Sequence, residues 1–317
     1  MGQIPVATPW PIGVKRSRGL FGGSGVVGGT RRCECPPVIG EATSSGRLLP
    51  VSRAGVVVLL ALAVANGPFL YLVPGRAEQD YAWAIEPPIN AGFLGAGYLA
   101  GTVATALVVF GARSWRSLRV LPLPLVVLSI ALLTATVIHA DRFRWDYPPT
   151  WLWTGIYACV PVLVALLWRL QERHAGPAPE PDPRLAALRA RSAALGLLLV
   201  IGGAALILAP AALADVWPWP LTPLLARALG SWYLLAGCAL LTAAVSLRRM
   251  HEVPIPYATL LAWSALLLAL PALHADDLAE RPAALVAWLA VQALLVALAV
   301  SALARAAPVL RAEGERL

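Results

Sequence analysis

Hydrophobic residues form eight long runs along the chain, separated by short stretches that hold most of the charged residues. The runs cover residues 54–73, 89–110, 120–139, 150–168, 193–213, 223–246, 257–274 and 283–305. A helix rises ~1.5 Å per residue, so a run of about 20 residues reaches across a hydrocarbon core of roughly 30 Å. The pattern therefore predicts an all-α, polytopic membrane protein with eight transmembrane helices.

Much of this pattern occurs twice, at a spacing of 135 or 136 residues. The recurring pairs are Pro74 with Pro210, Trp83 with Trp219, Pro87 with Pro223, Gly95 with Gly230, Tyr98 with Tyr233, His139 with His274, Asp141 with Asp276 and Trp153 with Trp288. Self-similarity at a fixed period indicates a duplicated structural unit. Because four runs fall in each copy, both copies would enter the membrane from the same side. We therefore expect two parallel four-helix repeats.

Polar and proline-rich stretches set the expected domain boundaries. The first of them is rich in Gly, Pro, Ser and Arg and has no hydrophobic period, so it is expected to be disordered. The expected organisation is a disordered N-terminal tail at 1–50, a first membrane repeat at 51–176, a Pro-rich cytoplasmic linker at 177–190, a second membrane repeat at 191–306 and a cytoplasmic tail at 307–317.

The composition agrees with a membrane location. Of the 317 residues, 59% are hydrophobic and 13% are charged, and the mean hydropathy is +0.71. Soluble domains contain about 25% charged residues. The net charge is +8, but the basic residues lie mostly in short loops on alternate sides of the hydrophobic runs. We therefore expect the lipid bilayer as a partner and no nucleic acid.

The distribution of basic residues predicts the orientation. If the amino end is cytoplasmic, 20 of the 25 Lys and Arg residues fall on the inner side, where membrane proteins carry their excess of basic residues. Both termini are therefore expected in the cytoplasm. Lys15 is the only lysine, which is typical of a GC-rich bacterial genome. Residues 217–232, WPWPLTPLLARALGSW, resemble multi-span proteins of such bacteria, and the resemblance implies no activity. The expected location is the plasma (inner) membrane of a bacterium.

Arg227 is an unusual residue because it lies about one turn inside the sixth hydrophobic run. A charged side chain costs ~2.5–3.5 kcal/mol at the centre of a transmembrane helix, so charge inside the membrane indicates function. The expected partner is acidic, either Glu86 or Asp276. The nearest counterparts of Arg227 in the first copy, Asn90 and Gly92, are uncharged.

His139 and His274 each begin the sequence His-Ala-Asp, in which Asp141 and Asp276 follow two residues later. One interpretation is a helix cap, since a histidine suits the negative end of the helix dipole. The repetition adds two others, which are metal or haem binding and the handling of protons or ions. No cofactor is predicted, and a metal, if bound, would use His139 and His274.

Tryptophans gather near the ends of the runs on the expected outer side. They could form an aromatic belt at the lipid headgroups, consisting of Trp83, Trp145, Trp151, Trp153, Trp217, Trp219 and Trp288. Alternatively, the helix ends beside them face a cavity that holds an anion. Thr222 is expected to cap the helix that begins at Pro223. The glycines within residues 92–101 predict close contact between helices.

The sequence contains no HExxH, GxSxG, Walker or CxxC motif, so an enzyme is not favoured. The leading hypothesis is binding or transport of a small solute or ion through an outward-facing cavity between the two repeats. Its expected lining is Glu86, Asn90, His139, Asp141, Arg227, His274 and Asp276, with Trp83 and Trp219 as walls. Two alternatives are an accessory or scaffold subunit with a membrane protein partner, and a metal or haem protein that uses His139 and His274.

Overall fold

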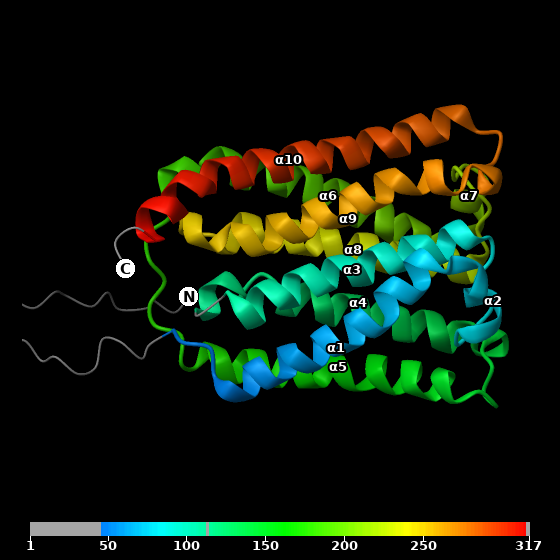
Figure 1. Cartoon of the computed structure of the whole chain (residues 1–317), viewed down its shortest axis with the longest axis horizontal. Coiled ribbons are helices and arrows are strands. Elements are labelled where there is room, and N and C mark those ends of the chain that lie inside the picture. Colours follow the sequence, from blue (N-terminus) through cyan, green and yellow to red (C-terminus); the bar gives the residue numbers. More distant parts are fainter. Residues whose placement is uncertain (1–45, 112–113, 315–317) are drawn as a thin grey trace, which may run out of the picture. The chain divides into compact units, whose positions relative to one another are not determined.

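A computed structural model describes residues 46–111 and 114–314, and this part of the chain is all-helical, without a β-strand (Figure 1). Most of the expected disordered tail, residues 1–45, lies outside the described residues. The all-α fold class is therefore confirmed for the part that the structure describes.

Eight long helices follow the eight hydrophobic runs. They are α1 (Pro50–Leu72), α3 (Pro88–Phe110), α4 (Pro122–Ile138), α5 (Pro148–Glu172), α6 (Ala186–Leu208), α8 (Pro223–Ser246), α9 (Pro254–Leu273) and α10 (Pro282–Gly314). All but α6 begin with proline, whose missing N–H group costs nothing in a first helical turn. The connections hold two short helices, α2 (Ala77–Asp80) and α7 (Pro210–Ala214), and several 3₁₀ turns. Two helices extend beyond the expected membrane repeats, since α6 begins within the linker and α10 continues into the C-terminal tail.

Seven of the described helices are long and apolar enough to cross a membrane. The remaining long helix, α4, is apolar but has 17 residues. At ~1.5 Å per residue it covers roughly 26 Å of a hydrocarbon core of about 30 Å. The helices are those of a multi-pass membrane protein, and the number of eight spans stays a prediction.

The long helices pack in matching pairs. In the first half of the chain (α1 to α5), α3 packs against α1 and α4 packs against α5. In the second half (α6 to α10), α8 packs against α6 and α9 packs against α10. Two further pairs, α3 with α9 and α4 with α8, join the halves.

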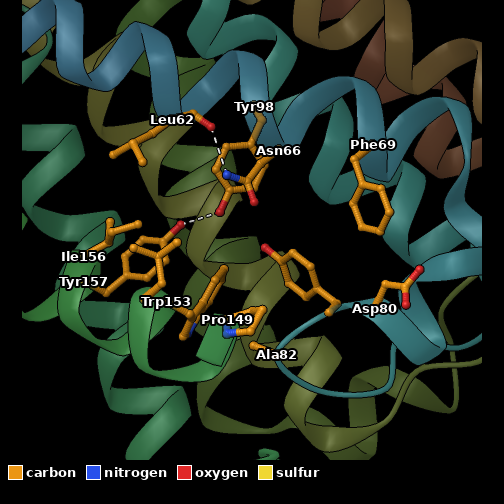
Figure 2. A pocket seen from close by; sticks show the side chains of 12 residues that line it. Leu62, Asn66, Phe69, Asp80, Ala82, Tyr98, Pro149, Trp153, Ile156 and Tyr157 are labelled. Atoms are coloured by element: carbon orange, nitrogen blue, oxygen red, sulfur yellow. Dashed lines mark hydrogen bonds between the residues drawn. The ribbon is translucent and has the colours of Figure 1, made fainter. Parts of the chain in front are cut away.

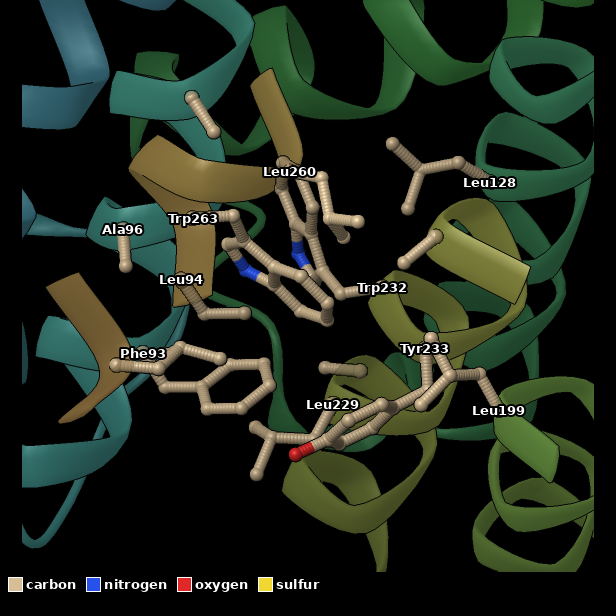
Figure 3. Close-up of a cluster of buried hydrophobic side chains, with 14 of the residues drawn as sticks. Phe93, Leu94, Ala96, Leu128, Leu199, Leu229, Trp232, Tyr233, Leu260 and Trp263 are labelled. Atoms are coloured by element: carbon tan, nitrogen blue, oxygen red, sulfur yellow. The ribbon is translucent and has the colours of Figure 1, made fainter. Parts of the chain in front are cut away.

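The buried core lies where these helices meet. Figure 3 shows Phe93 of α3, Trp232 and Tyr233 of α8 and Trp263 of α9 within one hydrophobic cluster. The ring of Phe93 lies 5.6 Å from that of Tyr233 and 6.1 Å from that of Trp263, measured between centroids. Aromatic contacts therefore run across the junction between the two halves.

Glycines allow the closest helix contacts. A Cβ atom on Gly95 would lie 2.6 Å from the backbone nitrogen of Tyr71, and one on Gly230 would lie 2.7 Å from the carbonyl oxygen of Gly203. Both distances are shorter than van der Waals contact, so only glycine fits at this helix spacing. The close contact predicted for residues 92–101, which include Gly95, is confirmed.

Four connections lie together at one end of the long helices, on the right in Figure 1. We call this end the histidine end, because it contains His139 and His274. Its connections are residues 73–87, 139–147, 209–222 and 274–281. Backbone hydrogen bonds tie these connections in pairs, from Arg144 to Ala82 and from Ala279 to Pro218.

Candidate functional site

Asn90 joins the two halves at the histidine end. It is fully buried in the first turn of α3, where its side-chain oxygen accepts a hydrogen bond of 2.9 Å from the indole N–H of Trp219. Its amide nitrogen donates to the carbonyl oxygens of Glu86 and Pro220, at 3.2 Å each. Since Trp219 and Pro220 belong to the second half, Asn90 fixes the connection between α7 and α8 against α3.

Arg227 contacts a histidine. Its guanidinium Nη1 lies 2.7 Å from Nε2 of His139, the residue that caps the C-terminal end of α4. Among the described residues no carboxylate forms an ion pair with Arg227, so its expected acidic partner is not found. In this same part of the chain, the buried Nε of Arg227 has no hydrogen-bond acceptor.

The surroundings of His139 favour the neutral imidazole. Burial and the neighbouring Arg227 cation lower the pKa of His139, and Asp141 opposes this effect only in part. A neutral imidazole can accept a hydrogen bond from the guanidinium. The contact is therefore best described as a cation donating to a neutral ring.

His274 occupies the matching position at the end of α9 and has a different partner. Its Nδ1 lies 3.5 Å from Oδ2 of Asp277, and the same carboxylate oxygen accepts a 2.9 Å hydrogen bond from the backbone N–H of Ile89. Asp277 thus satisfies a free N–H group in the first turn of α3, a helix that begins at Pro88. Thr222 caps α8 as predicted, because its side-chain oxygen accepts a hydrogen bond from the backbone N–H of Leu225.

Asp277 was missed by the sequence analysis, because the repeated aspartate is its neighbour Asp276. The sequence spacing does indicate this contact, since Asp277 lies three positions after His274 and can reach it across one helical turn. A second signal was the N-terminus of α3, where Pro87 has no side-chain acceptor to offer.

Three of the expected lining residues take no part in the buried contacts of Asn90, Arg227 and the two histidines. Glu86, Asp141 and Asp276 are exposed. Asp141 forms a surface ion pair of 3.2 Å with Arg142, and the carboxyl of Glu86 pairs with that of Glu78, which raises the pKa of Glu86.

The two histidines have different partners in the structure. His139 contacts Arg227 of α8, whereas His274 contacts Asp277 and faces Gly92 of α3. Within residues 46–111 and 114–314, no group of three or more His, Cys, Asp or Glu side chains is arranged to hold a metal ion.

Six of the seven tryptophans of the predicted belt fall into two groups, and the seventh, Trp217, is half-buried and packs against Trp219. Trp145 and Trp151 are 36% and 61% exposed, as expected for an aromatic belt. Four others lie inside the protein and are at most 7% exposed: Trp83, Trp153, Trp219 and Trp288. The belt interpretation is therefore wrong for these four, because they pack in two buried aromatic clusters, one in each half.

A cavity of about 170 Å³ lies in the first half, beside the aromatic cluster at the histidine end (Figure 2). It is bounded by α1, α3, α5 and the connection at residues 80–82. None of the nine predicted site residues lines it. The predicted cavity was placed between the halves, whereas this one is built from the first half alone.

Aromatic rings form most of one wall of the cavity. The ring of Trp153 lies 5.7 Å from that of Tyr81 and 4.3 Å from that of Tyr157, measured between centroids. Trp83 packs 4.8 Å behind Trp153 and does not line the cavity. The predicted wall residue Trp83 thus supports the wall from outside.

Polar groups of the cavity are only partly satisfied. The hydroxyl groups of Tyr98 and Tyr157 share a hydrogen bond of 2.6 Å, and the amide nitrogen of Asn66 donates to the carbonyl oxygen of Leu62 at 2.9 Å (Figure 2). Tyr81 is 6% exposed, and its hydroxyl lies close to that of Tyr98, but among the described residues no hydrogen bond of ordinary geometry joins it to a partner. Burial raises the pKa of Tyr81 well above its usual value, so this hydroxyl stays protonated.

Comparisons of the chain with protein-family models, with curated proteins and with solved structures found no match.

Proposed function

We propose that the chain is an eight-span membrane protein built from two parallel four-helix repeats, located in the inner membrane of a bacterium. The helix pairs support this arrangement, because the two main pairs of the first half, α1 with α3 and α4 with α5, have counterparts in α6 with α8 and α9 with α10. The spacing of 135 or 136 residues between matching side chains supports it as well. The distribution of Lys and Arg residues favours cytoplasmic termini and an outward-facing histidine end.

The proposed function is binding of a small solute in the cavity of the first half, as the recognition step of a transporter or a membrane receptor. The observation that carries it is the buried hydroxyl of Tyr81 beside an open cavity. A buried polar group without a partner costs about 1–3 kcal/mol. The Tyr81 oxygen has almost no accessible surface, so a ligand bonds to it and recovers this energy only when the Tyr81 side chain turns toward the cavity. In this proposal Asn90, His139, Arg227 and Asp277 position the helices, and the cavity holds the solute.

Native mass spectrometry of the full chain, purified from its membrane in a mild detergent, tests the binding. Leu62 lines the cavity, so Leu62→Trp should fill it. We expect a bound non-protein mass on the natural protein and its loss from Leu62→Trp. Val64→Trp is the matched control, because Val64 lies on the same helix and is 48% exposed. Equal adducts on the natural protein and on Leu62→Trp would contradict the proposal, as would the absence of an adduct from all three proteins.

A further inference from the structure

We propose that the cavity recognises an organic cation with N–H donors, specifically a primary alkylammonium group. This inference rests on the proposed function, because it names the ligand class of the same cavity. It is carried by the charge of the lining, its aromatic faces and its unused hydrogen-bond acceptors.

The charge of the lining favours a cation. Asp80 is an acidic residue at the cavity, and the twelve described lining residues include no Arg, Lys or His. An anion would therefore find no positive side chain in this lining. Asp80 already forms an ion pair of 2.6 Å with Arg76, whose side chain is 70% exposed. Exposed pairs of this kind are weak, so a ligand ammonium can compete for the carboxylate.

The aromatic lining favours a cation too. Five of the twelve lining residues are aromatic, which are Phe69, Tyr81, Tyr98, Trp153 and Tyr157. A cation is attracted to the face of an aromatic ring within about 6 Å of its centre, and clusters of such faces are used to bind ammonium ligands. Apolar walls also strengthen the attraction, because they exclude water from around the charge.

The hydrogen-bond groups select the kind of ammonium. The amide nitrogen of Asn66 is occupied by Leu62, which leaves the side-chain oxygen of Asn66 for a ligand. The Tyr81 hydroxyl can accept a hydrogen bond, and the Asp80 carboxylate can accept several. A primary ammonium carries three N–H donors, whereas a quaternary ammonium carries none. The lining therefore fits a primary amine better than a quaternary one.

The same acceptors are missing from the matching positions of the second half. The residues 136 positions after Asn66, Asp80 and Tyr81 are Gly202, Val216 and Trp217. Since the helix pairs of the two halves match without these side chains, the scaffold does not require them. We attribute their presence in the first half to a ligand that uses them.

Two sources could supply the ammonium group, a free amine or the headgroup of an ethanolamine phospholipid. Leu152 lines the cavity and is 62% exposed on α5, so a lipid beside this helix could reach the cavity. The recognised chemistry is the same in both cases.

The test uses the full-length protein in nanodiscs that contain only glycerol-headgroup phospholipids, titrated calorimetrically with 2-phenylethylammonium and with its neutral analogue 2-phenylethanol. We expect the amine to bind at least about tenfold more tightly than the alcohol. Asp80→Asn and Tyr81→Phe should each weaken amine binding about fivefold or more. Glu78→Gln is the matched control, because it removes an exposed acid two residues away and should leave binding unchanged. Thermal unfolding of each variant shows that it is folded.

A second set of nanodiscs, containing ethanolamine phospholipid, distinguishes the two sources. If a lipid is the natural ligand, this lipid should stay bound in native mass spectrometry and compete with the free amine. Without competition, the amine itself is the ligand. Either result supports the proposal, provided that Asp80→Asn weakens binding.

Equal affinities for the amine and the alcohol, both lost in Leu62→Trp, would overturn the ammonium assignment and leave the proposed function in place. The assignment would also fail if neither the amine nor the ethanolamine lipid bound. In that case the proposed function would still stand if the purified protein carried another adduct that Leu62→Trp removes.

Discussion

The two buried aromatic clusters at the histidine end occupy matching positions and differ in how their hydroxyl groups are used. In the second half, the hydroxyl of Tyr233 accepts hydrogen bonds from Trp288 at 2.7 Å and from Gln292 at 3.3 Å. In the first half, the matching Tyr98 bonds to Tyr157, and a cavity lies beside them. The Tyr233 hydroxyl is thus bonded to donors within its own half, whereas the Tyr98 and Tyr157 pair lies beside a cavity.

The difference comes from a few side chains on one scaffold. Trp217 stands where the first half has Tyr81, and its ring packs 5.5 Å from Trp219 and 6.1 Å from Tyr233. The larger indole occupies space and brings no hydroxyl group. Under the proposed function, the helix pairs determine where a cavity can form, and connection residues such as Tyr81 determine whether it can hold a polar ligand.

The largest expected effect comes from breaking the scaffold that both halves share. Gly95→Ala places a Cβ atom 2.6 Å from the backbone nitrogen of Tyr71, and Gly230→Ala places one 2.7 Å from the carbonyl of Gly203. We expect each to lower the free energy of unfolding by up to about 3 kcal/mol, as overpacking does. Denaturant titration in detergent micelles measures this.

Gly155→Ala is the control for these two substitutions, because a Cβ atom on Gly155 meets no other group within 4 Å. It should leave stability unchanged or raise it slightly, since alanine favours a helix over glycine. If Gly95→Ala behaved like Gly155→Ala, the close contact between α1 and α3 would be refuted.

A smaller loss is expected when the first half is given the residue of the second half at Asn90. The matching residue, 135 positions later, is Leu225. Asn90→Leu leaves the buried indole N–H of Trp219 without its acceptor, which should cost about 2 kcal/mol. The denaturant midpoint of the variant measures this cost.

Trp219→Phe in the same background should restore part of that stability, because it removes the unpaired donor. A double-mutant cycle over the two sites isolates their interaction energy. Independent, additive effects would show that the hydrogen bond between Asn90 and Trp219 contributes little.

The next effect concerns ligand affinity. The double substitution Asp80→Val with Tyr81→Trp gives the first half the side chains of the second half at both positions. It should reduce 2-phenylethylammonium binding at least about tenfold, which is ~1.4 kcal/mol. The calorimetric titration described above measures it, and Glu78→Gln is the control. Unchanged affinity would mean that the two clusters differ for a reason unrelated to this ligand.

The helices could be predicted from the sequence because their signals are local. The run predicted at 223–246 coincides with α8, where Thr222 caps the first turn and Pro223 opens it. His139 and His274, which recur in the two copies, both lie at the histidine end in the structure.

The cavity could not be predicted in the same way, because it depends on which side chains meet after folding. Tyr81 and Tyr157 are far apart in sequence, and the repeat drew attention to conspicuous matching residues instead. The partner of Arg227 is also a tertiary contact. A charge inside a hydrophobic run suggests an acid, whereas the structure brings a neutral imidazole from α4.

The smallest expected effect concerns the response of His139 to acid. The pKa of His139 is lowered from its ordinary value of 6.5 in the folded protein. At a pH between that ordinary pKa and the lower folded pKa, the unfolded chain therefore binds a proton at His139 more readily than the folded protein does. Stability should therefore fall as the pH falls through that window and be fully present above it. The groups that face His139 are Arg227 on α8 and Asp141 and Arg142 beside it, and the two arginines oppose its protonation.

His139→Gln tests this response, because an amide oxygen can still accept a hydrogen bond from Arg227 but does not titrate. The loss of stability between about pH 7.5 and pH 5 should be smaller in this variant than in the natural protein, as measured by denaturant titration at both values. His174→Gln is the control, because His174 is exposed outside the histidine end, and it should keep the natural pH dependence. An identical pH dependence in His139→Gln and the natural protein would show that folding does not lower the pKa of His139. The contrast between the His139–Arg227 contact and the His274–Asp277 contact would then lie in their geometry alone.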